Sequence, residues 1–445
     1  MTSHTRSPHF FVSPFAVASS LAIAVSAGNA VAGGFEKATL WDAEYSALAG
    51  AAVSSVNDSS AIFFNPAGMA FAESNDIALH VSPTFTTTNG PAGGQGTFID
   101  GETNFSPAGG FTGLFKLNEK FTMGYGIYAA GGAASKYEDV TVGDKFTVPL
   151  PGPFPDVNVN AVTGDYSTDI QIIEAGLGLS YRINKNWAVG GTYRLTYATA
   201  DINLLATQAA FGNNVGASVG YNDMSGFNTF GVRLGAMFRS DDNRWGWGIN
   251  YRSEVDVEAD GDYNYRDGTG ATAKGDATAK TALPMQISTG VDYQVAPNWT
   301  LFGEITYSEY SNNEQIKFTS DDVSDLAVPA INSNWEDQYN YRIAAEYTGI
   351  ENWALRAGYI YTTAVVPEEY AAPTFSTPAN AHSFTFGAGT TILDGQVALD
   401  FAAEYNMAEN DSVKGGGDLT STTKAYAGKY ESNAYALHAS VKYKF

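Results

Sequence analysis

The sequence has no cysteine and, beyond its first 32 residues, no apolar run long enough to form a membrane-spanning helix. Without cysteine there is no disulfide framework and no thiol chemistry. A spanning helix needs about 20 consecutive apolar residues, so a helical membrane protein is disfavoured. Lysine and arginine are also scarce, with 24 against 47 aspartate and glutamate residues. The resulting net charge of −23 argues against a nucleic-acid-binding protein, which needs a basic surface.

Groups suited to catalysis or metal binding are equally sparse. Only His80, His382 and His438 follow residue 32, and their spacing fits no metal site. We predict no nucleophile elbow, no phosphate-binding loop, no catalytic residue, no metal and no cofactor. A barrel hydrolase that uses His80 as its base is the enzymatic alternative.

The residues that are abundant favour β-strands. The chain contains 26 tyrosine, 26 phenylalanine and 47 glycine residues, an aromatic-rich mixture. Apolar residues make up 44% of the chain, yet the mean hydropathy is −0.16, which indicates that polar residues are interleaved with them. Turn signals recur from residue 75 onward, so we expect one large all-β unit rather than several soluble domains.

Fourteen stretches alternate apolar and polar residues with the period of two that a β-strand imposes. They are residues 77–85, 111–117, 121–127, 173–181, 189–197, 230–238, 245–251, 285–293, 301–307, 339–347, 355–361, 384–392, 397–405 and 435–445. A closed bacterial barrel requires an even number of strands. We therefore predict an all-β fold, a 14-stranded antiparallel transmembrane β-barrel.

The connections between these stretches alternate in length. Short connections are expected near 118–120, 184–186, 240–243, 296–298, 349–352 and 394–395, and long ones near 89–105, 132–165, 205–225, 264–281, 319–335, 364–380 and 408–430. A soluble β-sandwich would also alternate apolar and polar residues. Short turns on one side and long loops on the other are typical of an outer-membrane barrel and favour that interpretation.

Four tryptophans begin strands on the short-turn side at nearly equal intervals. They are Trp187, Trp245, Trp299 and Trp353. Because the indole ring is amphipathic, these residues predict an aromatic girdle at the periplasmic membrane surface. The last stretch alternates strictly and ends in Phe445, which resembles the C-terminal assembly signal of outer-membrane proteins.

The same alternation assigns the strand charges to the lumen. The residues concerned are Arg182, Arg194, Arg233, Arg342, Arg356, Glu174, Glu304, Glu346 and Glu404. A charge on the lipid face costs up to about 2–4 kcal/mol at the membrane midplane, so this assignment fits a barrel. We interpret these groups as an interior ion-pair network that holds a plug, with direct ligand contact as the alternative.

The N-terminal part of the chain differs from the strands. Residues 1–32 have an apolar run and the small-residue site Ala30-Val31-Ala32, which predict a secretory signal peptide. Residues 33–74 combine helical spacing of apolar residues with a Pro-Ala-Gly break that a sheet interior would reject. We predict that residues 33–74 form a plug, or hatch, inside a barrel made by residues 75–445.

Several motifs occur in one order along the chain. They are Phe64-Asn65-Pro66-Ala67-Gly68-Met69, Tyr251-Arg252-Ser253-Glu254-Val255, Leu283-Pro284, Trp299, Thr306-Tyr307-Ser308, Tyr341-Arg342-Ile343-Ala344, Asn352-Trp353 and Arg356-Ala357-Gly358. This set resembles the FadL-type long-chain fatty acid and hydrophobic-compound transporters of Gram-negative outer membranes, the OmpP1/FadL/TodX-like family. The resemblance covers essentially the whole chain after the signal peptide.

The resemblance implies a 14-stranded barrel closed by the N-terminal hatch, with ligand captured at outer loops and then held in an apolar pocket near the hatch. It also implies a side passage to the bilayer at a kink in the third strand, facing the hatch motif. The hatch motif is Asn65, Pro66 and Ala67, and the candidates for the kink are Gly124, Gly126 and Gly131. The candidate ligand contacts are Lys317, Phe63, Phe64, Leu204, Leu205 and Phe211. The capture loops are residues 148–154 and 202–211.

We predict passive uptake of long-chain fatty acids or other hydrophobic small molecules across the outer membrane of a Gram-negative bacterium. We expect a monomer that contacts outer-membrane lipid and lipopolysaccharide and no nucleic acid. A general or solute-specific porin is the alternative class. Some relatives carry basic residues where this chain has Tyr197-Ala198-Thr199-Ala200-Asp201. An aromatic or alkane hydrocarbon therefore stays open as the substrate.

Overall fold

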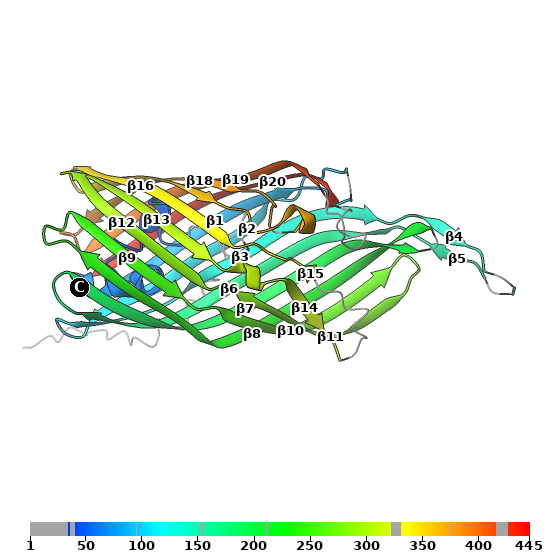
Figure 1. The fold of residues 1–445 in the computed structure, drawn as a ribbon, viewed down its shortest axis with the longest axis horizontal. Coiled ribbons are helices and arrows are strands. Elements are labelled where there is room, and N and C mark those ends of the chain that lie inside the picture. Colours follow the sequence, from blue (N-terminus) through cyan, green and yellow to red (C-terminus); the bar gives the residue numbers. More distant parts are fainter. Residues whose placement is uncertain are drawn as a thin grey trace, which may run out of the picture.

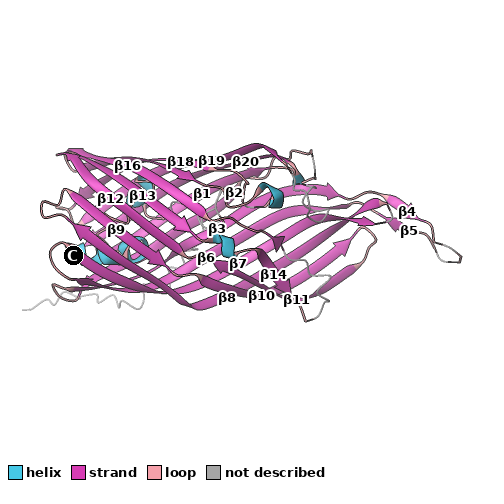
Figure 2. Ribbon diagram, in the orientation of Figure 1, coloured by secondary structure: helices cyan, strands magenta, loops and turns pink. Residues whose placement is uncertain are grey.

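The computed structural model describes residues 34–35, 41–94, 96–150, 152–153, 155–210, 212–321, 331–374, 376–414 and 426–445, and the predicted signal peptide lies outside them. The strands form a long barrel, and short helices lie inside it toward one end (Figure 1, Figure 2). Among the described residues, no helix is both long and apolar enough to cross a membrane.

The strands are β1 (Asp76–Asn89), β2 (Asn104–Lys116), β3 (Phe121–Val142), β4 (Phe146–Val148), β5 (Val157–Val159), β6 (Val162–Arg182), β7 (Trp187–Ala210), β8 (Asn213–Arg239), β9 (Trp245–Arg252), β10 (Val255–Asp267), β11 (Thr272–Leu283), β12 (Gln286–Ala296), β13 (Trp299–Ser308), β14 (Gln315–Thr319), β15 (Ile331–Asn332), β16 (Gln338–Ile350), β17 (Trp353–Thr362), β18 (Ala381–Ile392), β19 (Val397–Val413) and β20 (Gly428–Lys444).

The wall has 14 spanning strands, which confirms the prediction. Strands β9 and β10 are two segments of one spanning strand because β8 pairs with both, and β11 and β12 continue each other in the same way. Strands β14 and β15 are inserted between β13 and β16, and β4 pairs only with β5. Strand β1 pairs with β2 on one side and β20 on the other, which closes the sheet into a barrel.

Side chains alternate between the outer surface and the lumen along each strand. In β20 the apolar residues Tyr435, Leu437 and Val441 are exposed, whereas Ala436 and His438 are buried. An apolar outer surface and a filled interior are what a lipid-embedded barrel needs.

The strand charges face the lumen, as predicted. Seven of the nine predicted residues are buried, namely Arg194, Arg233, Arg342, Arg356, Glu174, Glu304 and Glu404. The other two also lie inside, since Glu346 pairs with Arg356 at 2.7 Å and Arg182 stands over the hatch ring of Phe71. The predicted interior ion pairs are therefore present.

The four predicted girdle tryptophans are the first residues of β7, β9, β13 and β17. Trp187, Trp245, Trp299 and Trp353 are 39–45% exposed on the outer surface. One ring of amphipathic side chains at the short-turn end is the arrangement that fixes a barrel at the membrane surface.

The prediction of a capture loop over residues 202–211 is wrong, because residues 202–210 belong to strand β7. Strand β7 extends to Ala210 and pairs with β8 as far as Asn213, so most of the loop expected near 205–225 is sheet. Figure 1 shows β7 and β8 continuing with their neighbours toward the end of the barrel opposite the hatch.

The loop expected over residues 264–281 is also mostly sheet, because only residues 268–271 separate β10 from β11. Tyr221 and Tyr263 explain the extensions: both are buried and pack their rings 5.7 Å apart inside the barrel. The apolar interior of the barrel continues along the extended parts of β8 and β10, and burial of their inward side chains stabilises strands where the sequence alone shows polar stretches.

The hatch consists of α1 (Ala43–Ala47), α2 (Ala61–Phe64) and the 3-10 turn η1 (Pro66–Phe71). Asp42 begins α1 by accepting hydrogen bonds from the backbone N–H groups of Glu44 and Tyr45. The apolar side chains of the hatch pack against Leu114, Met237 and Phe302 of the wall, among others. Two further 3-10 turns, η2 (Tyr310–Asn312) and η4 (Glu368–Tyr370), lie between wall strands.

Candidate functional site

Three cavities follow one another from the outer mouth of the barrel to the hatch. The outer cavity is lined by Thr168, Ile202, Ile316, Ile331, Asn332, Ser333, Trp335, Val366, Tyr370, Ala372, Thr374 and Ser376. It shares Ile202 and Ile316 with the next cavity, so the two are continuous.

The second cavity, the apolar cavity, is formed by the inward faces of β6, β7, β8, β10, β11 and β14. Its lining residues are Phe35, Ile170, Ile172, Ala198, Thr199, Ala200, Ile202, Met224, Val257, Ala259, Ala279, Thr281, Leu283, Ile316 and Phe318. A cavity with this lining can hold an alkyl chain or an aromatic ring away from water.

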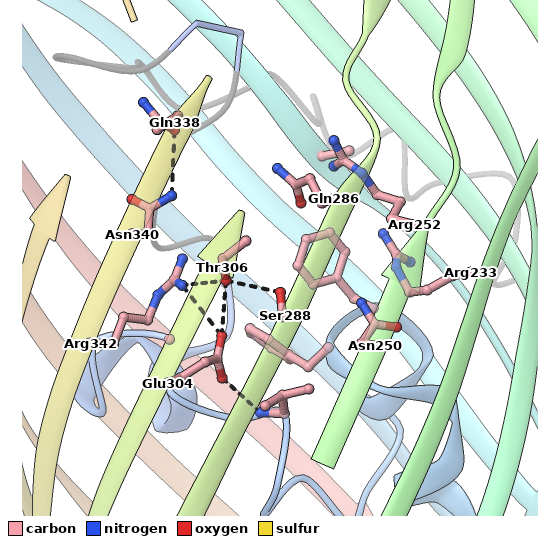
Figure 3. Close-up of a pocket in the computed structure, with 15 residues that line it drawn as sticks. Arg233, Asn250, Arg252, Gln286, Ser288, Glu304, Thr306, Gln338, Asn340 and Arg342 are labelled. Atoms are coloured by element: carbon pink, nitrogen blue, oxygen red, sulfur yellow. Dashed lines mark hydrogen bonds and ion pairs between the residues drawn. The ribbon is translucent and has the colours of Figure 1, made fainter. Parts of the chain in front are cut away.

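The third cavity, the polar cavity, lies between the hatch and the wall (Figure 3). The hatch contributes Gly50, Val53, Phe63 and Phe64, and the wall contributes Ala130, Arg233, Asn250, Arg252, Gln286, Ser288, Glu304, Thr306, Gln338, Asn340 and Arg342. Three guanidinium groups and one carboxylate face this space. The cavity therefore suits the polar, anionic end of a ligand.

Contacts within the polar cavity fix its charged groups. Arg342 bonds to Glu304 at 3.3 Å and to Thr306 at 2.7 Å. Glu304 also accepts the backbone N–H of Val53 at 3.0 Å, which ties the wall to the hatch (Figure 3). Arg252 donates to the carbonyl of Pro284 at 3.0 Å. Pro284 follows Leu283 of the apolar cavity, so Arg252 lies where the two cavities meet.

Arg233 connects the polar cavity to a buried ion-pair network. Glu174 bonds to Arg194 at 2.6 Å and to Arg233 at 3.1 Å. Arg233 also donates to the hydroxyl of Tyr128 and to the hatch carbonyl of Ile62. Buried charges need such partners, and this network joins β3, β6, β7, β8 and the hatch.

The wall opens between β2 and β3. Their backbone pairing begins near the short turn and ends at Gly110 and Tyr128. Beyond that point, within the described parts of the chain, β2 pairs with β1 alone, through Asn104–Gly109, and β3 with β6 alone. At the far end, the backbone N–H of Glu102 reaches the carbonyl of Lys136 at 2.8 Å. We call this gap, bounded by β2 Asn104–Gly109 and β3 Ala129–Ser135, the window.

A bulge bends β3 at the window. The register with β6 passes from Ala129 to Gly131, so Ala130 is an extra residue on β3. Every residue from Tyr128 to Ser135 is buried, which shows that both faces of this part of the strand are covered while it stays paired with β6. The N–H of Gly132 donates to the carbonyl of Phe35, so the start of the described chain lies against the window.

The three glycines predicted for the kink lie in two settings. Gly131 adjoins the bulge, whereas Gly124 and Gly126 keep regular pairing with both neighbours. Gly124 instead leaves room for the sulfur of Met69, which would lie 2.4 Å from a side chain there. The irregular part of β3 therefore begins after Gly126.

Ionic contacts attach the hatch to β17 and β20 of the wall. Glu44 bonds to Arg356 at 3.1 Å and to Lys442 at 3.2 Å, and Asp58 also pairs with Lys442. Burial disfavours the charged form of Glu44, but Lys442 and Arg356 lower its pKa to about 2. Burial raises the pKa of Asp42 to about 7 despite the attraction of Lys442. Glu44 thus stays charged at neutral pH and holds the hatch through its ion pairs with Arg356 and Lys442.

The hatch motif contacts β8 rather than β3. Asn65 is fully buried, donates to the carbonyls of Val53 and Ala236, and accepts from the N–H of Ala67. Its amide oxygen would lie 1.9 Å from a side chain at Gly235. The hydrogen bonds of Asn65 thus run to the hatch itself and to β8, which follows β3, β6 and β7 around the wall. Asn65 attaches the hatch to β8, whose Arg233 lines the polar cavity.

Replacing Asn65 by leucine is expected to leave the barrel folded and to reduce uptake. Each buried partner left without its hydrogen bond costs about 1–3 kcal/mol, and release of Val53 would shift the hatch lining of the polar cavity. Heat-modifiable mobility on gels and uptake of a labelled fatty acid measure the two effects. Normal uptake by a correctly inserted variant would show that the motif has only a structural role.

The predicted ligand contacts separate in the structure. Phe63 and Phe64 line the polar cavity. Leu204 and Leu205 pack in a cluster with Tyr166 near the outer end. Lys317 lies on the exposed face of β14, opposite the neighbours that line the apolar cavity, which argues against ligand contact. Phe211 lies outside the described residues.

Other residues of the site carry no signal in the sequence alone. Arg252 belongs to a recognised motif, but only the fold places it between two cavities. Phe35 and Trp41 precede the wall strands in sequence, yet the fold places them against Gly132 and Tyr128 of β3. Residues Gly216–Gly220 do match the Gly-x-Ser-x-Gly pattern, contrary to the prediction that the sequence has no nucleophile elbow. They lie within strand β8 and not at the strand-to-helix turn that a nucleophile elbow requires.

Comparison with known sequences gives one family match and several relatives. The sequence model of a family described as outer membrane protein transport protein (OMPP1/FadL/TodX) matches residues 153–445. The long-chain fatty acid transport protein of Escherichia coli O6:H1 is 25% identical over 369 residues, covering 74% of this chain and 75% of that protein. A putative outer membrane protein of Neisseria meningitidis serogroup B is 23% identical over 433 residues, covering 89% and 91%.

Solved structures share the fold. A FadL homologue of Pseudomonas aeruginosa has a TM-score of 0.74 at 17% identity and covers 93% of this chain and 100% of its own. The toluene transporter TodX of Pseudomonas putida has a TM-score of 0.70 at 16% identity and covers 92% and 99%. At these identities the likeness supports the barrel with its internal hatch.

Proposed function

We propose that this chain, which belongs to the outer membrane transport protein family OMPP1/FadL/TodX, takes up long-chain fatty acids or related hydrophobic molecules across the Gram-negative outer membrane by passive diffusion. The observation that carries the proposal is a set of three neighbouring cavities beside an opening in the wall: the outer and apolar cavities share Ile202 and Ile316, and the apolar and polar cavities adjoin at Pro284.

The order of the cavities sets the path. A ligand captured at the outer cavity passes Ile202 and Ile316 into the apolar cavity, where its chain exchanges water for apolar contacts. Its polar end then reaches Arg252 and the polar cavity. Ala130 of the window lines the polar cavity and Phe35 beside the window lines the apolar one, so either part of the ligand can leave sideways into the bilayer.

The polar cavity favours a fatty acid over a neutral hydrocarbon. The relatives include a fatty acid transport protein and a toluene transporter, and the apolar cavity alone would suit either ligand. Toluene has no polar atom to meet the guanidinium groups of Arg233, Arg252 and Arg342 or the four carboxamide side chains of this cavity. An anionic carboxylate can accept charge-assisted hydrogen bonds from these groups.

The hatch argues for a dedicated transporter rather than a porin. It lies inside the barrel and is tied to β8, β17 and β20 by both ion pairs and hydrogen bonds. Water-filled porins need an open lumen. We infer that the protein moves its ligand without chemical change and that the driving force is partitioning into the bilayer.

Two measurements test the proposal. In a strain without its own fatty acid transporter, expression of this chain is expected to restore uptake of labelled oleate and growth on it. Liposomes that contain the purified protein are expected to resist swelling in sugar solutions. Sugar permeation at porin rates, or unrestored oleate uptake by a correctly inserted protein, would contradict the proposal.

A further inference from the structure

The point at which β2 and β3 separate is occupied by an aromatic pair. Tyr128 and Gly110 form the last backbone pair of the two strands. The ring of Trp41, from the hatch, stacks on Tyr128 with centroids 5.0 Å apart and planes inclined by 28°. Both side chains are fully buried. A side chain at Gly110 would lie 3.2 Å from the Trp41 ring and 2.9 Å from Cβ of Tyr128, so the indole fills the space above this glycine.

Tyr128 is held from its other side as well. Its ring meets Phe63 of the hatch edge to face at 5.4 Å. Its hydroxyl donates to Glu174 at 2.5 Å and accepts from Arg233 at 3.3 Å. The residue that ends the β2–β3 pairing is thus fixed by the hatch on one side and by the buried ion-pair network on the other.

The described parts of β2 and β3 share no strand pairing across the window. Continuation of the observed register would place Gly109 opposite Ala129 and Ala108 opposite Ala130. Neighbouring antiparallel strands tend to continue their hydrogen-bond ladder, so a contact at the separation point must hold these two apart. The bulge bends β3 relative to β6, and the carbonyl of Phe35 accepts the N–H of Gly132, but the last pair, Gly110 and Tyr128, precedes both features.

We propose that Trp41 and Tyr128 form a wedge, positioned by the hatch, that keeps β3 from pairing with β2 and thereby holds the window open. Trp41 and Tyr128 are positioning residues, since they act through the wall and touch the backbone at the separation point. The effect on uptake rests on the proposed function, whereas the effect on the wall does not.

The absence of native cysteine allows a direct test. With Ala108→Cys and Ala130→Cys in the full-length protein in outer-membrane vesicles, a disulfide under mild oxidation reports pairing across the window. The parent protein is expected to cross-link slowly. Trp41→Ala is expected to raise the cross-linked fraction several-fold, and Trp41→Phe, which keeps a stacking ring, is expected to return it to the parent level.

A matched control removes a hatch ring elsewhere. Phe71→Ala, at the end of η1 beside Arg182, is expected to leave cross-linking at the parent level. Where Trp41→Ala does not insert, Tyr128→Leu carries the same expectation because it removes the other ring of the pair. Equal cross-linking in the parent and in the inserted wedge variants would overturn the proposal.

Uptake separates this inference from the proposed function. Increased cross-linking in Trp41→Ala with a parallel loss of oleate uptake supports the wedge and the sideways exit. Increased cross-linking with normal uptake supports the wedge and contradicts exit through the window. Unchanged cross-linking contradicts the wedge whatever the uptake.

Discussion

Deletion of Ala130 is expected to lower oleate uptake on the order of tenfold or more, because removal of the extra residue of a bulge straightens the strand that carries it. Ala129 and Gly131 already pair with Ile173 and Ile172, which are adjacent in β6. Joining them by deletion keeps every later residue of β3 opposite its present partner. The strand should then straighten beside β6 and narrow the window, even with the Trp41–Tyr128 pair in place.

The matched control is Ala130→Gly, which keeps the extra residue and removes only a methyl group. It is expected to transport oleate like the parent. Both variants are checked by heat-modifiable mobility, and uptake is measured with the same label and expression level. If the inserted deletion variant takes up oleate normally, the ligand leaves the barrel by another route.

Replacement of Arg252 by glutamine is expected to weaken binding of a long-chain fatty acid roughly tenfold to a hundredfold, because a hydrogen bond to a charged group contributes about 1.5–3 kcal/mol. Arg252 is a better residue to replace in this test than Arg342, because removal of Arg342 would leave the buried Glu304 without its ion pair. Binding to the purified protein is measured by isothermal titration calorimetry with oleate.

A neutral ligand provides the internal control for this prediction. Binding of a long-chain alcohol is expected to change little in Arg252→Gln, because the alcohol has no charge for the guanidinium to meet. Lys317→Gln removes a cation from the exposed face of β14 and is expected to bind oleate like the parent. If Arg252→Gln loses the same affinity for the fatty acid as for the alcohol, Arg252 shapes the cavity rather than binding the head group.

The lumen is divided by chemistry as well as by depth. The inward faces of β6, β7, β10 and β11 supply the apolar cavity, and those of β9, β12, β13 and β16 supply the polar cavity. The boundary between them lies at Arg252 and Pro284, where β9 passes into β10 and β11 into β12. A molecule with a long chain and a polar end can fill both cavities at once, which neither a sugar nor toluene can do.

Much of the barrel was determined by the sequence itself. The period-two alternation identified all 14 spanning strands and the inward direction of Arg194, Arg233 and Glu174, because a strand in lipid must send every second residue to the apolar side. The tryptophans at the strand starts followed from the same rule. These features depend on neighbours in the chain and on the surrounding solvent.

The length of the strands and the place of the hatch motif were decided by the tertiary structure. Strands β7 and β8 continue as far as Ala210 and Asn213 because their inward side chains find an apolar interior, which the local sequence does not show. Asn65 bonds to β8 and not to β3 because the path of the hatch inside the barrel, rather than the motif, sets its neighbours.

The site was decided almost wholly by tertiary structure. Trp41, Tyr128 and Arg252 are distant in sequence, and no period or spacing relates them. The bulge at Ala130 could not be read from an alternating pattern, since one extra residue shifts the register without changing the composition. Alternation fixes which way a side chain points, but which strands lie opposite it, and where two of them part, depends on how the whole wall closes around the hatch.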